Sequence, residues 1–232
     1  MNEQRLPTFA GYAGAGALDA DRQRVLRNTY WLLALSMVPT VLGAWLGVST
    51  GITAAMGTGL SAIVFLAGAF GFMFAIEKTK HSATGVVVLL AFTFFMGLML
   101  ARLLATILGF RNGSSLIMTA FGGTAVVFLG MASLATVVKR DLSGMGKFLF
   151  VGALILLVAG LVNIFLQSSA LMLTLSVLAI VIFSGFMLFD IKRVIDGGET
   201  NYISATLAIY LDIYNVFQSL LMILGVVGGE RD

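Results

Sequence analysis

The chain has 232 residues, of which 59% are hydrophobic and only 11% are charged, and its formal net charge is +3. A water-soluble domain carries about 25% charged residues, so this composition excludes a soluble globular enzyme and predicts an integral membrane protein. Cys is absent, which excludes disulfides and thiolate metal sites. The basic residues lie in short connectors between apolar segments, where they indicate membrane topology and not nucleic-acid binding.

Residues 1–28 are predicted to form a cytoplasmic N-terminal tail. They contain no apolar run, which argues against a cleavable signal peptide, and Gly and Ala dominate residues 11–17, which favours a flexible segment. Asp19 or Asp21 is expected to cap a short basic helix that leads into the membrane. The remaining residues, 29–232, are predicted to form one transmembrane domain.

A membrane-spanning helix needs about 20 mainly apolar residues, and seven segments of the chain meet this requirement. They are residues 30–48, 59–76, 85–109, 116–138, 147–166, 171–189 and 203–227. The connectors between them are too short for a soluble domain. The predicted fold class is therefore an all-α integral membrane protein with seven transmembrane helices.

The distribution of Lys and Arg predicts the orientation. The tail and the second, fourth and sixth connectors, with the adjoining span ends, hold 11 of the 14 basic residues, whereas the opposite side holds only Arg111 and Arg231. The remaining one, Arg102, lies inside a span. Because cytoplasmic loops are enriched in Lys and Arg, the N-terminus is predicted to be cytoplasmic and the C-terminus to lie outside.

Asp212 is the most informative polar residue, because a charge inside a span is costly and usually marks a functional site. Residues at helical spacing form a small and polar stripe with it, so this face should point into the bundle. The stripe is Ala205, Ala208, Asp212, Asn215 and Ser219, and it is flanked by Tyr214 and Gln218. The alternative is a neutral carboxyl group that serves only as a packing contact between helices.

Asp190 ends the sixth apolar segment and precedes Lys192 and Arg193. It could be a solvated helix end, but a helix that continues to about Ile195 would turn Asp190 inward, near Asp212. Two carboxyl groups at the cytoplasmic mouth of a bundle would share one proton. Without that proton they would offer oxygen ligands to a cation such as calcium.

Three further features have simpler interpretations. Arg102 is expected to lie near the outer face and to anchor there, with pairing to a bundle carboxylate as the alternative. His81, the only His, is expected to be a solvated loop residue, although its chemistry suits pH sensing. The small-residue pair Gly43 and Gly47 predicts close helix packing and nothing more.

The chain resembles the Bax-inhibitor (transmembrane Bax-inhibitor-motif) family, in its bacterial YccA-type branch. The likeness runs from about residue 22 to the C-terminus, and its most specific part is the connector Gly197-Gly198-Glu199-Thr200-Asn201-Tyr202. The other segments that carry it are Val25-Leu26-Arg27-Asn28-Thr29-Tyr30, Gly122-Gly123-Thr124-Ala125, Asn163-Ile164-Phe165-Leu166-Gln167, Phe189-Asp190 and Tyr210-Leu211-Asp212-Ile213-Tyr214-Asn215.

The resemblance implies a seven-helix inner-membrane protein whose last helix is central. It also implies two functions. YccA-type members are modulators and substrates of FtsH, a membrane-anchored ATP-dependent protease, which engages them through the N-terminal tail. Members with two facing Asp residues, which match Asp190 and Asp212, are pH-sensitive calcium leak channels.

The chain departs from the family at two positions. Arg102 stands where the family usually has Pro, so the third helix should be straighter. The channel-type members use an Arg in the second span to latch the Asp pair, and here only Lys78 could replace it.

Four functions remain, and protease modulation ranks first because its resemblance covers most of the chain. A proton-gated calcium leak through Asp190 and Asp212, with Asn215, Tyr214 and Gln218 as supporting polar residues, is the alternative. A purely structural membrane protein comes third. An intramembrane enzyme comes last, because no Ser has a base and no span contains His. We therefore expect a lipid-embedded protein that is not an enzyme and needs no cofactor, with calcium as the one candidate ion.

Overall fold

The computed structural model describes residues 10–230, and within this range the protein is built only of helices and their connectors. The helices are α1 (Ala10–Thr50), α2 (Ile52–Ala55), α3 (Gly57–Thr79), α4 (Ala83–Leu108), α5 (Gly113–Val137), α6 (Ser143–Leu166), α7 (Ser169–Ile195) and α8 (Tyr202–Gly228). All except α2 are long and apolar enough to cross a membrane. The prediction of an all-α protein with seven transmembrane helices is confirmed.

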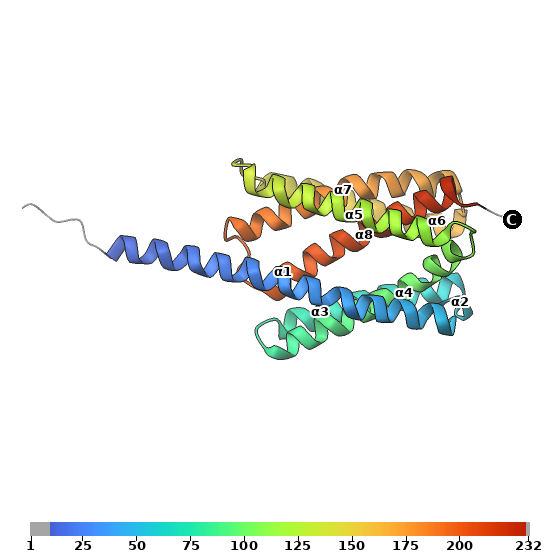
Figure 1. The fold of residues 1–232 in the computed structure, drawn as a ribbon, viewed down its shortest axis with the longest axis horizontal. Coiled ribbons are helices and arrows are strands. Elements are labelled where there is room, and N and C mark those ends of the chain that lie inside the picture. Colours follow the sequence, from blue (N-terminus) through green and yellow to red (C-terminus); the bar gives the residue numbers. More distant parts are fainter. Residues whose placement is uncertain (1–9, 231–232) are drawn as a thin grey trace, which may run out of the picture.

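Helix α1 begins earlier than the sequence predicted. It runs without interruption from Ala10 through the membrane-spanning part, Ala20–Thr50. Asp19 and Asp21 both lie inside this helix, so the prediction that one of them caps a new helix is wrong. The Ala residues of this stretch favour helix, and the span provides a helix already formed on which they continue. Figure 1 shows the N-terminal end of α1 projecting beyond the rest of the bundle. Residues 1–9 of the predicted tail lie outside the described residues.

Helices α1 and α4 make the most extensive contact in the bundle, and glycines allow their backbones to approach. A Cβ atom placed on Gly43 would lie 2.1 Å from the carbonyl oxygen of Phe94, and one on Gly97 would lie 1.9 Å from that of Thr40. These distances are far below van der Waals contact. The small residue predicted at Gly43 therefore serves close packing, and Gly97 is its counterpart on α4.

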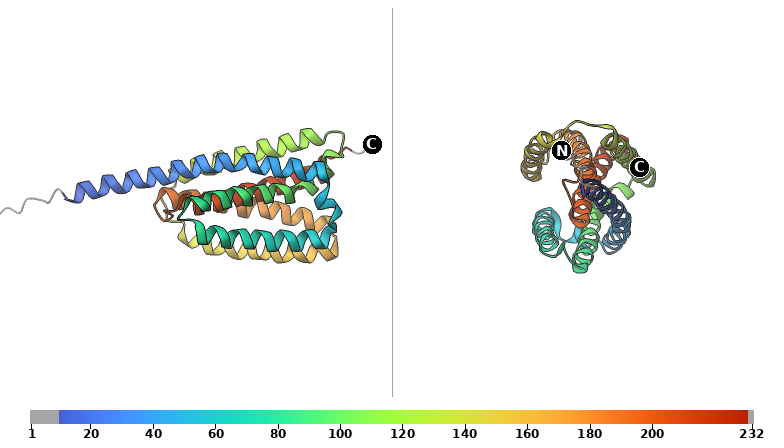
Figure 2. Two further views of the ribbon diagram at one scale, coloured as in Figure 1. Left: turned by 90° about the horizontal axis from the view of Figure 1, so that it is seen from below. Right: turned by 90° about the vertical axis from the view of Figure 1, so that its left-hand side faces the viewer.

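Helix α8 packs against α1, α3, α4, α5 and α7. Its buried residues lie on all sides of the helix, as the consecutive pair Ile209 and Tyr210 and the alternating Asp212, Tyr214 and Val216 show. Helix α6 is the opposite case, because its buried set contains only Leu149 and its close packing is against α7. The view along the bundle in Figure 2 shows α8 with helices on several sides. A polar group on α8 is therefore held away from lipid.

The two ends of the bundle carry different parts of the chain. The N-terminal end of α1 lies at the same end as the α3–α4, α5–α6 and α7–α8 connectors, and the C-terminal end of α8 lies at the other (Figure 1). Helix α7 continues to Ile195, as the sequence predicted. Its last turns therefore reach the end of the bundle at which α8 begins.

Candidate functional site

Asp190 and Asp212 form the acid pair of the bundle, one on α7 and the other on α8. Asp212 is only 4% exposed, whereas Asp190 is half-buried. Their side chains lie close enough to act on each other directly. A hydrogen bond between two carboxyl groups needs a proton on one of them, because an ionised carboxylate only accepts. The other oxygen of Asp212, Oδ2, is buried without a hydrogen-bond partner among the described residues. The structure thus brings the two predicted residues together at one interface between helices.

The charges around the acid pair come from the end of α7 and the connector that follows it. Arg193 and Glu199 are the charged groups that act on Asp190 besides Asp212. They also pair with each other, with 3.5 Å between Arg193 Nη2 and Glu199 Oε2. Lys192 is directed instead to Asp196 on its own helix end. Among the described residues, Arg193 is thus the cation that acts on Asp190, and it is shared with a third carboxylate, that of Glu199.

Lys78 does not take the place of the latching Arg in the second span. It is exposed, and its ammonium group lies 5.4 Å from the centre of the Phe74 ring. This contact is a cation–π interaction at the end of α3. In the structure Lys78 is thus engaged at the end of α3 and not at the acid pair.

The polar residues predicted to support the pair point elsewhere. Tyr214 donates from its hydroxyl group to the carbonyl oxygen of Met96 on α4, at 3.3 Å. Asn215 donates to the carbonyl oxygen of Leu211 on its own helix, at 2.8 Å. Gln218 lines a cavity toward the opposite end of the bundle. They are polar contacts of α8 but do not surround the aspartates.

Tyr210 is a buried polar contact that the sequence reasoning missed. It is 1% exposed, its hydroxyl oxygen lies 3.0 Å from that of Thr40 on α1, and it donates to the carbonyl oxygen of Thr93 on α4 at 3.4 Å. Its ring is 6.2 Å from that of Tyr214. Tyr210 therefore joins α8 to α1 and α4. The signal was a Tyr in the middle of an apolar span, where its hydroxyl group needs a partner.

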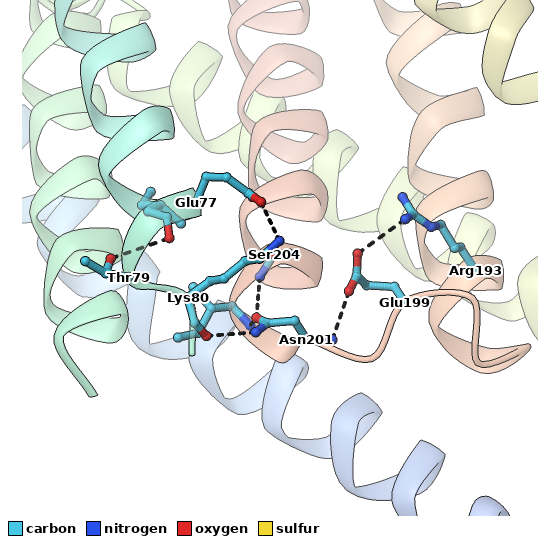
Figure 3. Close-up of polar contacts among 9 residues, drawn as sticks. Glu77, Thr79, Lys80, Arg193, Glu199, Asn201 and Ser204 are labelled. Atoms are coloured by element: carbon cyan, nitrogen blue, oxygen red, sulfur yellow. Dashed lines mark hydrogen bonds and ion pairs between the residues drawn. The ribbon is translucent and has the colours of Figure 1, made fainter. Parts of the chain in front are cut away.

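The α7–α8 connector is ordered by its own side chains (Figure 3). Asn201 accepts from the backbone N–H groups of Ile203 and Ser204 at 2.9 and 3.1 Å, which caps α8, and its amide donates to the carbonyl oxygen of Lys80 at 2.7 Å. Glu199 in turn accepts from the backbone N–H of Asn201 at 2.9 Å. This motif links the α3–α4 and α7–α8 connectors and holds the start of α8.

Gly197 brings the connector against α1. Its φ angle is +79°, and a Cβ atom placed on it would lie 2.6 Å from Nε of Arg22. The positive φ angle favours Gly at this position, and the absence of a side chain leaves room for Arg22. The N-terminal part of α1 thus lies against the connector between α7 and α8.

Arg102 and His81 lie away from the acid pair. Arg102 donates to the hydroxyl group of Thr58 at 2.9 Å, toward the end of the bundle opposite to Asp212. Among the residues that the structure describes, no carboxylate forms an ion pair with it. His81 is exposed in the α3–α4 connector.

Within residues 10–230 no three or more His, Cys, Asp and Glu residues cluster as metal ligands, so the acid pair could give a cation only two side chains.

Comparison with known proteins decides the family. Residues 22–229 match the family described as inhibitor of apoptosis-promoting Bax1. The chain belongs to the Bax inhibitor family. The match begins at Arg22, the residue that lies against Gly197, and it extends across all seven membrane-spanning helices except the first two residues of the first span.

Several bacterial relatives align over nearly the whole chain. The modulator of FtsH protease YccA from Escherichia coli is 41% identical over 202 residues, which are 87% of this chain and 90% of that protein. An uncharacterized membrane protein of Vibrio cholerae is 39% identical over 90% of this chain and 92% of its own. An uncharacterized protein of Neisseria meningitidis is 41% identical over 90% and 93%. The relative from another E. coli strain is named inner membrane protein YccA, which agrees with a multi-pass inner-membrane protein.

Proposed function

We propose that the protein is a modulator and substrate of an FtsH-type membrane-anchored ATP-dependent protease, and that it acts by binding and not by catalysis. One observation carries the proposal: the relative named modulator of FtsH protease is 41% identical over 87% of the chain. The alignment covers 202 of the 232 residues, so the proposal rests on most of the chain.

The shape of the bundle supports this function. A protease that extracts membrane proteins needs a segment to grip, and the N-terminal end of α1 extends beyond the other helices (Figure 1). The segment is continuous with the helix whose contact with α4 is the largest in the bundle. Pulling on it therefore acts directly on the best-packed interface. Slow extraction of such a bundle would occupy the protease and delay its other substrates.

Deleting residues 2–20 tests the proposal. The deletion removes the projecting end of α1 and leaves the membrane-spanning part, so the bundle should fold while its degradation by the protease slows several-fold. The measurement is the half-life of the protein in cells with and without FtsH, together with the half-life of a second FtsH substrate. The stabilised form should lengthen the half-life of the second substrate.

A matched control replaces residues 2–20 by a shuffled sequence of the same composition. It keeps the length of the segment, so it should be degraded at the rate of the natural chain if the protease needs only a handle. If the deletion variant and the natural chain disappear equally fast, and only when the protease is present, the segment is not the handle and the proposal fails in this form.

The acid pair favours a second candidate function, the proton-dependent passage of a cation such as calcium. What supports it is the contact between Asp190 and Asp212 inside the bundle and the unpartnered Oδ2 of Asp212. Loss of the proton that joins the two groups would leave two negative charges side by side, which favours separation of α7 from α8 or entry of a cation. This activity is compatible with protease modulation, since it uses a different part of the molecule.

A further inference from the structure

A partly open cavity of about 710 Å³ lies toward the end of the bundle opposite to the acid pair. Its lining comes from α2, α3, α4, α7 and α8, near the ends of α4 and α8 and the starts of α3 and α7. This volume is in the range of small-molecule binding sites. Neither the proposed protease modulation nor the acid pair uses this space.

Arg102 brings a positive charge into the cavity. Its guanidinium group has five N–H donors, and one of its nitrogens donates to Thr58 at 2.9 Å. It forms no ion pair with a carboxylate among the described residues. A cation on a membrane-spanning helix is costly without a counter-charge, so the cavity is complementary to an anion.

Thr53 is a second, independent sign of a polar ligand. This residue of α2 lines the same cavity and is 2% exposed, yet its hydroxyl oxygen has no hydrogen-bond partner among the described residues. Other Thr residues near it bond to their own helix, as Thr106 does with the carbonyl oxygen of Arg102 at 3.0 Å. A buried hydroxyl group left without a partner loses the free energy of a hydrogen bond, which a ligand would restore.

The rest of the cavity is suited to a hydrocarbon chain. Its apolar lining includes Phe65, Met99, Leu103, Met172, Met222 and Val226. Helices α3 and α7 both contribute to the lining and are not among the helix pairs that pack closely. Figure 1 shows them in the two separate groups of helices, α3 beside α4 and α7 beside α5 and α6. The cavity is partly open, so an acyl chain from the surrounding bilayer can enter it.

We propose that this cavity binds an anionic phospholipid from the leaflet at that end of the bundle. The phosphate group is held by the fork of Arg102, whose geometry matches phosphate oxygens, and by the hydroxyl group of Thr53. An acyl chain occupies the apolar part. A lipid fits better than a free anion. The acyl chain of a lipid gains free energy by contact with the largely apolar wall, whereas a small anion would lose its hydration there without that gain.

Native mass spectrometry of the full-length protein in detergent tests this assignment. Phosphatidylglycerol and phosphatidylcholine are titrated separately, and the natural chain should retain the anionic lipid more tightly. Arg102→Gln should weaken phosphatidylglycerol binding about tenfold or more, because it removes charged hydrogen bonds. Arg111→Gln is the matched control, since Arg111 is exposed near the same end but does not line the cavity; it should bind like the natural chain.

Two variants address the cavity without changing a charge. Ala62→Phe fills the space beside Ser61 and Phe65, and Thr53→Val removes only the unpartnered hydroxyl group. Both should weaken phosphatidylglycerol binding while Arg102 stays in place. They decide the question even if Arg102→Gln does not fold. If both retain the affinity of the natural chain, the cavity is not the lipid site.

Three other outcomes would overturn the proposal. Equal losses in Arg102→Gln and Arg111→Gln would mean general attraction of lipid to basic residues at the membrane surface. Unchanged binding in Arg102→Gln would remove Arg102 from the site. Displacement of phosphatidylglycerol by inorganic phosphate, added in excess, would mean that the site takes a free anion and not a lipid.

Discussion

At the scale of single residues, the sequence located the acid pair but not its surroundings. Charged groups inside apolar spans are rare, so Asp190 and Asp212 stood out, and the structure places their side chains in contact. Tyr214 could not support them, because residues two apart on a helix point about 200° apart. It contacts α4 instead. Helical periodicity gives a direction around one axis but does not say which neighbour lies there.

The pair predicts a pH-dependent flux that one substitution should abolish. In the natural protein, calcium uptake into proteoliposomes should rise with pH, because loss of the shared proton sets two carboxylates against each other at the α7–α8 interface. In Asp212→Asn, the amide can donate to Asp190 without any proton from solvent, so flux should stay low and lose its pH dependence. The measurement is calcium flux across a pH series with both proteins at equal density.

Two matched variants separate the pair from other acidic residues. Asp190→Asn should behave like Asp212→Asn, because coupled groups titrate as one unit. Asp21→Asn, an exposed residue of α1, should keep the profile of the natural protein. If either Asp190→Asn or Asp212→Asn also keeps that profile, the two residues are not a gate, and their contact serves only packing.

At the scale of helices, apolar length was a sufficient guide. Each predicted span lies inside an observed helix to within one residue at its C-terminal end, and Ile195 was expected as the end of α7. The sequence failed at the start of α1, because a Gly- and Ala-rich stretch reads as flexible when taken alone. It also missed α2, a single turn after Gly51, whose φ angle is +63°. The formation of such a short helix depends on the positions of the two helices that it joins.

Gly97 should be the most sensitive contact between two helices. The Cβ atom of Gly97→Ala would lie 1.9 Å from the carbonyl oxygen of Thr40, and backbone cannot rotate away as a side chain can. Helices α1 and α4 would have to separate, so we expect the free energy of unfolding to fall by about 1–3 kcal/mol. Thermal unfolding of the purified protein in detergent measures it.

Gly122→Ala provides the control for this prediction. Gly122 lies in α5, is exposed, and would have no atom within 4 Å of a new Cβ. Because Ala is a better helix former than Gly, this variant should unfold at the same or a higher temperature. Equal effects at the two positions would mean that loss of glycine, and not the α1–α4 contact, determines stability.

At the scale of the whole molecule, the fold class followed from composition, whereas the arrangement of sites did not. The acid pair and the Asn201 connector lie toward one end of the bundle, and the Arg102 cavity toward the other. The sequence indicated Arg102 as an anchor at the opposite face from the basic connectors. It could not indicate the cavity, because that space is formed by five helices that are distant in the chain.

The orientation of the bundle gives the last prediction. The end at which α1 begins and the α3–α4, α5–α6 and α7–α8 connectors gather (Figure 1) holds 10 of the 12 Lys and Arg residues that the structure describes. Cytoplasmic loops are enriched in these residues, so this end should face the cytoplasm. A periplasm-active reporter fused after Asp232 should be active, and one fused within residues 1–20 should be silent. Fusions in the α4–α5 and α5–α6 connectors should behave like the C-terminus and the N-terminus respectively. Reporter activity at both termini, or at neither, would contradict seven crossings. Reversed activities would place the acid pair at the outer end of the bundle and leave no cytoplasmic handle for the protease.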